Sequence, residues 1–251
     1  MEVLDNVWFY PVALAAVFLT GMGKSGFGMA GGLAVPMLAL VMSPVQAAAV
    51  MLPLLLASDA ASVWAYKRDW DRENMKIIVP AGLLGTLVGW ATFRFLDENA
   101  LRIILGAISL GFVASSLIWR NVPTRKPSRL KGWFWCTVSG VTSFVAQAGG
   151  PPLWVYLLPQ RLEKRLQAGT TIWFFAILNV SKIYPYFTLG LLTAANLTLA
   201  AGLIPVALIG IAVGLLVQRK LSTAWFFRVC YTVLFLTGVQ LLYKGIGGYS
   251  F

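Results

Sequence analysis

A weak internal repeat constrains the fold of this chain more than any other feature of its sequence. The windows 80–96 and 205–221 align without a gap over seventeen positions. They share seven residues: Pro80, Leu83, Gly85, Val88, Gly89, Arg94 and Leu96 in the first window, and Pro205, Leu208, Gly210, Val213, Gly214, Arg219 and Leu221 in the second. The chain is therefore expected to fold as two related halves.

A second pair of motifs agrees with this division. Ala30-Gly31-Gly32 is followed by Gln46-Ala47, and Ala148-Gly149-Gly150 is followed by Gln167-Ala168. In an apolar chain, internal repeats are typical of secondary transporters, which bind their substrate where the two repeats face each other.

The composition indicates a membrane protein. Of the 251 residues, 59% are apolar and only 12% are charged, against about 25% charged in a soluble domain. The net charge of +11 does not indicate a nucleic-acid partner, because the basic residues lie between apolar runs and form no basic face. Histidine is absent and the two cysteines are isolated, so neither a metal site nor a cofactor is expected.

Ten apolar segments are expected to form an all-α, polytopic membrane protein. They cover residues 7–20, 27–42, 45–66, 75–95, 100–119, 133–147, 150–158, 166–188, 194–217 and 223–243. Five segments fall in each half, and the stretch between the halves contains two prolines and five basic residues. We therefore predict a first transmembrane repeat at 1–119, a basic cytoplasmic linker at 120–132 and a second repeat at 133–251.

Lysines and arginines predict the orientation, because cytoplasmic loops retain them. With the N-terminus outside, fifteen of these residues fall inside and only Arg94, Arg102 and Lys244 fall outside. Both termini are then expected outside a bacterial cytoplasmic membrane. An odd number of crossings per half inverts the second repeat relative to the first.

Two pairs of segments are too short to span, because a helix needs about 20 residues to cross the hydrocarbon core. Residues 21–28 and 147–152, rich in glycine and proline, interrupt them at corresponding places in the two repeats. We expect broken or re-entrant helices there. Helix N-termini attract anions, so Gly149 and Gly150 are candidate site residues. The alternative is that these glycines only allow helices to pack closely.

The glycine-rich run Gly21-Met-Gly-Lys-Ser-Gly-Phe-Gly-Met-Ala-Gly-Gly-Leu-Ala-Val-Pro36 resembles the opening signature of the TauE/SafE family of sulfite and organosulfonate transporters. A degenerate copy at residues 139–152 and the basic central segment agree, and the resemblance covers essentially the whole chain. It implies a small sulfur-containing anion, such as sulfite, sulfoacetate or another short sulfonate, moved across the cytoplasmic membrane of a bacterium.

Three ionisable residues are expected inside the membrane, away from the ends of the spans: Lys24, Asp59 and Lys182. Such groups are candidate functional residues by default. The two lysines provide positive charge for an anion, and hydroxyl and amide donors would complete the site. The candidate donors are Ser25, Ser58, Gln147, Asn179 and Ser181.

Each of these residues also has a plainer interpretation. Lys182 would reach the outer interface, and Lys24 would be exposed at the end of a short first helix. Asp59 is the candidate proton carrier, and the alternative is a structural ion pair with Lys67, Arg68 or a lysine across the interface. Tyr184 and Tyr186 would line an outer vestibule or belong to an interfacial belt.

These patterns together favour a secondary transporter that works by alternating access, with proton coupling as an open question. The alternatives are an anion channel and a transporter of a different small anion. An enzyme is not expected, because the chain has neither histidine nor paired carboxylates for a catalytic site. The sequence does not give the oligomeric state.

Overall fold

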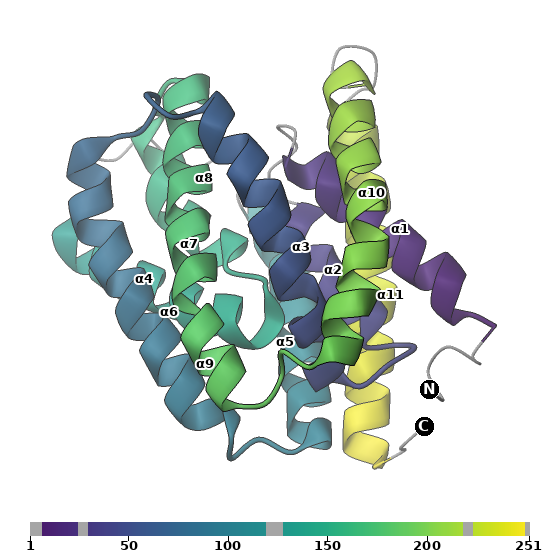
Figure 1. The fold of residues 1–251 in the computed structure, drawn as a ribbon. Coiled ribbons are helices and arrows are strands. Elements are labelled where there is room, and N and C mark those ends of the chain that lie inside the picture. Colours follow the sequence, from purple (N-terminus) through teal and green to yellow (C-terminus); the bar gives the residue numbers. More distant parts are fainter. Residues whose placement is uncertain (1–6, 25–29, 119–127, 218–222, 249–251) are drawn as a thin grey trace.

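The computed structural model describes residues 7–24, 30–118, 128–217 and 223–248, and Figure 1 shows their arrangement. In these residues every regular element is a helix. The elements in chain order are α1 (Phe9–Met22), the 3₁₀ turn η3 (Ala30–Leu33), α2 (Ala34–Leu38), α3 (Pro44–Ala65), α4 (Arg72–Phe93), α5 (Glu98–Ile118), α6 (Arg129–Ala146), α7 (Gly150–Leu157), the 3₁₀ turn η5 (Leu158–Gln160), α8 (Lys164–Ser181), α9 (Ile183–Thr188), α10 (Ala194–Val217) and α11 (Thr223–Gly247). The all-helical expectation is confirmed for the described residues.

Four of the described helices are long and apolar enough to cross a membrane. They are α3, α4, the Ala194–Gly214 part of α10 and the Arg228–Gly247 part of α11. The short helices α2, α7 and α9 come from segments that the sequence breaks with glycine or proline. Long apolar helices with short helices between them are typical of a multi-pass membrane protein.

The eighth apolar segment does not form one helix. It divides at Lys182 into α8 and α9. Pro185 explains the division, because proline has no N–H and its ring clashes with the carbonyl group four residues earlier, here that of Ser181. The break leaves the Lys182 side chain in the interior of the protein.

Close glycine contacts hold two helix pairs together. Gly85 of α4 lies against Gly140 of α6, where a Cβ atom on either residue would collide with the backbone of the other helix. Gly210 of α10 lies against Gly21 of α1 in the same way. Small residues let membrane helices approach each other closely. Gly85 and Gly210 are also a matched pair of the sequence repeat.

The apolar interior is divided into separate clusters on either side of α3. Besides a cluster that joins α3 to residues of α4, α5, α6 and α9, one cluster contains mainly residues of α1, α2, α3, α10 and α11, with two residues of α5, and another contains residues of α4, α6, α7 and α8. In Figure 1 these two groups of helices lie on opposite sides of α3. Since α3 packs against both α8 and α10, a side chain on α3 is able to reach across the boundary between the groups.

The connection between α3 and α4 is fixed to α8. Asp69 accepts a hydrogen bond from Arg165 Nε at 2.8 Å, and the backbone N–H of Asp71 donates to Thr170 Oγ1 at 2.9 Å. The indole N–H of Trp173 donates to the Tyr66 carbonyl oxygen at 3.1 Å. These contacts join the two halves of the sequence at one end of the molecule.

Candidate functional site

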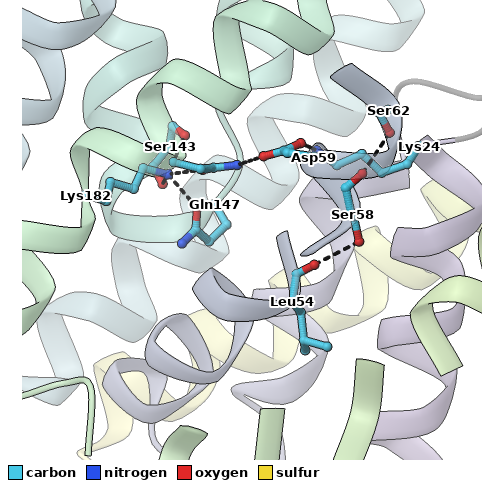
Figure 2. Close-up of polar contacts among 9 residues, drawn as sticks. Lys24, Leu54, Ser58, Asp59, Ser62, Ser143, Gln147 and Lys182 are labelled. Atoms are coloured by element: carbon cyan, nitrogen blue, oxygen red, sulfur yellow. Dashed lines mark hydrogen bonds and ion pairs between the residues drawn. The ribbon is translucent and has the colours of Figure 1, made fainter. Parts of the chain in front are cut away.

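Lys182 lies at the junction of α8 and α9, and its side chain is fully buried. Its Nζ donates to the backbone oxygen and the hydroxyl of Ser143, both at 2.8 Å, and to Gln147 Oε1 at 2.6 Å. A fourth contact joins it to Asn179 Oδ1 at 3.0 Å. Figure 2 shows Ser143 and Gln147 around the lysine.

The contacts around Lys182 are those that a protonated amine makes. The oxygens of the Ser143 backbone, the Gln147 amide and the Asn179 amide only accept hydrogen bonds. Three such acceptors need three N–H hydrogens, which an ammonium group has and a neutral amine lacks. In the described residues all the hydrogen-bond partners of this cation are neutral oxygens.

Asp59 lies on α3, and only 3% of the residue is exposed. One carboxylate oxygen forms an ion pair with Lys24, at the end of α1. The other oxygen accepts a hydrogen bond from Asn179 Nδ2 at 2.6 Å. Asn179 therefore joins the two ionic groups, because its amide donates to Asp59 and accepts from Lys182.

Gln147 and Tyr186 extend the network to α9. Gln147 ends α6 in the left-handed conformation, with φ of 51°. Its Nε2 lies 3.3 Å from the hydroxyl oxygen of Tyr186, which in turn donates to the Phe144 carbonyl oxygen at 2.9 Å. The side chain of Gln147 thus contacts Lys182 with one end of its amide and Tyr186 with the other.

The turn that follows the first interruption lies beside the second interruption, close to this network. A Cβ atom on Gly32 would lie 3.4 Å from the Cβ of Ala148, which is ordinary van der Waals contact. The carbonyl oxygen of Gly149 accepts a hydrogen bond from Ser139 Oγ at 2.5 Å. Gly150 begins α7, and a Cβ atom there would have open space around it.

The structure brings together five of the residues expected at the site: Lys24, Asp59, Gln147, Asn179 and Lys182. Their close arrangement does not test substrate binding, so their role in binding the substrate stays a prediction. The interfacial alternative for Lys182 does not describe a side chain that is 0% exposed. Lys24 is not a freely exposed residue either, because its side chain is only 14% exposed and pairs with Asp59.

Three other predicted donors lie outside this network or outside the described residues. The Ser58 hydroxyl donates to the Leu54 carbonyl oxygen of its own helix at 2.8 Å, as Figure 2 shows. The Ser181 hydroxyl does the same with Leu178 at 2.7 Å. Ser25 lies outside the described residues. The Asp59 carboxylate pairs with Lys24, not with Lys67 or Arg68.

Sequence reasoning missed Ser143 and assigned Tyr186 to the wrong environment. Tyr186 is fully buried, whereas Tyr184 is 65% exposed. A lone serine in a helix rich in small residues gives no signal by itself. The sequence does space Ser139, Ser143 and Gln147 four residues apart. This spacing places the two serines on one face of α6, in line with Gln147 just after the helix.

A charged network of this kind is suited to binding an anion. If all three ionisable side chains are charged, two lysines and one aspartate leave one net positive charge, and Lys182 has no carboxylate among its hydrogen-bond partners.

A family model described as Sulfite exporter TauE/SafE matches residues 13–241, nearly the whole chain. The chain has no significant match among curated proteins or among solved structures.

Proposed function

Because the chain belongs to the sulfite exporter TauE/SafE family, we propose that it carries a small sulfur oxyanion across a bacterial cytoplasmic membrane as a secondary transporter. Membership confirms the resemblance seen at residues 21–36, and the family is one of membrane transport proteins. Sulfite and short sulfonates such as sulfoacetate are the substrates we propose.

The observation that carries this proposal is the buried ammonium group of Lys182, whose hydrogen-bond partners are neutral oxygens. A buried charge without a counter-ion is costly, and an oxyanion would supply both the missing charge and strong acceptors. The contact of Gly32 with Ala148, which is next to Gln147, supports a site between the two halves of the sequence. Gly149 and Gly150 would offer backbone N–H groups to the remaining oxygens of the anion.

We further propose that residues 1–119 and 133–251 are inverted repeats, joined by a cytoplasmic linker at 120–132, with both termini outside. The matched glycines support this, because Gly85 packs on α6 and Gly210 packs on α1 in the same manner. Alternating access would come from one group of helices rocking against the other. The contacts between the α3–α4 connection and α8 would then open and close with each cycle.

Asp59 is the candidate for proton coupling. It is the buried carboxylate of the network and is joined to Lys182 only through the Asn179 amide. Protonation of Asp59 would end its ion pair with Lys24 and free a second cation beside the anion. A proton and an anion would then move together.

Uptake into liposomes tests the proposed function. Purified protein is reconstituted, and uptake of labelled sulfite and sulfoacetate is measured with and without a pH gradient. We expect saturable uptake that the gradient accelerates. In Lys182→Met, which keeps the length of the side chain and removes its charge, kcat/KM should fall by about 10- to 100-fold, the cost of losing a charged hydrogen-bonding group.

The matched control is Lys76→Met, because Lys76 is an exposed lysine on α4 that pairs only with Glu73. Its uptake should equal that of the wild-type protein, and all three proteins should elute alike in size-exclusion chromatography. Unchanged uptake in Lys182→Met would refute the assignment of the anion site. Unitary currents in a planar bilayer would indicate a channel instead of a carrier.

A further inference from the structure

The Nζ group of Lys182 has no hydrogen left for a substrate in the described arrangement. Its three hydrogens face four acceptor atoms, which belong to Ser143, Gln147 and Asn179. An anion that binds this ammonium group must therefore displace at least one of these oxygens. Which oxygen leaves decides what part of the protein moves when the substrate arrives.

Two of the four acceptors are held in place by other hydrogen bonds. The backbone oxygen of Ser143 also accepts from the Gln147 N–H at 3.1 Å, as part of the last turn of α6. The Ser143 hydroxyl is on a short side chain of the same helix. Asn179 is fixed by the 2.6 Å hydrogen bond from its Nδ2 to Asp59. The two carbonyl oxygens do not withdraw without disturbing a helix or the ion pair. The Ser143 hydroxyl donates as well as accepts, so it is able to turn its hydrogen toward an arriving anion.

Gln147 is different from the other two residues. Its side chain is longer, and it begins at the residue that follows α6, where the backbone turns into the left-handed conformation. The other end of its amide makes a single 3.3 Å contact, with Tyr186. A rotation of this side chain therefore removes one acceptor from Lys182 and breaks only one further hydrogen bond.

We propose that the Gln147 amide oxygen holds the place of a substrate oxygen while the site is empty, and that the arriving anion displaces it. This inference rests on the proposed function and specifies how that site is filled. A charged oxyanion forms a stronger hydrogen bond with an ammonium group than a neutral amide does, so the exchange is favourable. Displacement also releases Tyr186 from Gln147, which links occupation of the site to α9.

Replacing a residue that binds the substrate weakens binding, whereas replacing a residue that competes with the substrate strengthens it. If Gln147 competes with the anion, removing its amide should improve binding, and fixing a negative charge there should prevent it. If Gln147 instead donates its N–H to the substrate, removing the amide should weaken binding. The two roles are therefore distinguished by the sign of one measurement.

The test measures equilibrium binding of labelled sulfite to the purified full-length protein in detergent. For Gln147→Ala we expect a Kd lower than that of the wild type by up to about tenfold. For Gln147→Glu, which keeps the shape and places a carboxylate on Lys182, we expect a Kd raised by about 100-fold or more. The thermal unfolding temperature of each variant checks that the protein is folded.

A Gln147→Ala protein that is folded and binds sulfite more weakly than the wild type would overturn the proposal. So would unchanged binding in Gln147→Glu. Lys182→Met is measured in parallel, because its loss of binding tests the anion site itself. If the wild-type protein does not bind sulfite, the proposed substrate fails and this inference fails with it. If only the Gln147 results disagree, the anion site stands and the placeholder role does not.

Discussion

The ion pair between Lys24 and Asp59 joins the end of α1 to the middle of α3. Asp59 is almost completely buried and also accepts from Asn179. Removing one partner of a buried ion pair leaves an uncompensated charge, which destabilises a protein by about 3–5 kcal/mol. Any test of Asp59 in proton coupling must therefore separate the lost proton site from the unpaired lysine.

We expect Asp59→Asn to abolish the acceleration of sulfite uptake by a pH gradient while sulfite binding persists, because an amide takes up no proton. The companion variant Lys24→Met/Asp59→Asn has neither charge and should recover most of the lost stability in thermal unfolding. Both variants should show the same insensitivity to the gradient in liposomes. Gradient-driven uptake that survives in the double variant would exclude Asp59 as the proton carrier.

At the scale of helices, the glycine contacts between α4 and α6 are as consequential as the polar network. A Cβ atom on Gly85 would collide with the backbone of α6 near Thr137. Gly85→Ala should therefore push the helices apart and destabilise the protein by about 1–3 kcal/mol, as overpacking does. The measurement is thermal unfolding in detergent.

Gly202 of α10 provides the matched control for this prediction. It is also within a helix, but a Cβ atom there would have no neighbour within 4 Å. Gly202→Ala should leave stability unchanged or raise it by about 1 kcal/mol, because alanine favours the helix. Equal effects of the two substitutions would show that close packing of α4 on α6 contributes little.

The apolar runs predict most helices because lipid-facing and buried helices need long apolar stretches. The expected segments 45–66 and 194–217, for example, correspond to α3 at Pro44–Ala65 and α10 at Ala194–Val217. The expected break at residues 147–152 is also present, since α6 ends at Ala146 and α7 begins at Gly150. Glycine and proline concentrated in one place give a clear local signal.

The break at Lys182 and the partners of the candidate site are less visible in the sequence. A single proline, Pro185, marks the end of α8, and a lone proline is also compatible with a kinked but continuous helix. The pairing of Lys24 with Asp59 depends on where the end of α1 lies relative to α3, which the spacing of apolar residues does not predict. A charged residue within an apolar segment can therefore be recognised in the sequence as a candidate site residue. The residues that it contacts can be identified only from the packing of the helices.

At the scale of the whole molecule, the orientation of α4 tests the proposed topology. Lys67 precedes this helix, Arg94 follows it, and both residues are exposed. Lys67→Cys is expected to react with a membrane-impermeant maleimide only after cells are permeabilised. Arg94→Cys is expected to react in intact cells, because the proposed topology places it outside.

The native protein is the background control for this labelling, since Cys136 and Cys230 are both buried. They should remain unlabelled under native conditions. Labelling of both introduced cysteines from the same side would contradict a membrane crossing by α4. Labelling of Lys67→Cys alone in intact cells would reverse the proposed orientation of the whole chain.

The contact of α1 with α10 bears on how the protein is made. During synthesis α1 leaves the ribosome long before α10, so Gly21 meets its partner at Gly210 only after the residues between them have been translated. The order of insertion therefore differs from the order of packing. A chain that ends before α10 would leave Gly21 without the helix that covers it in the folded protein.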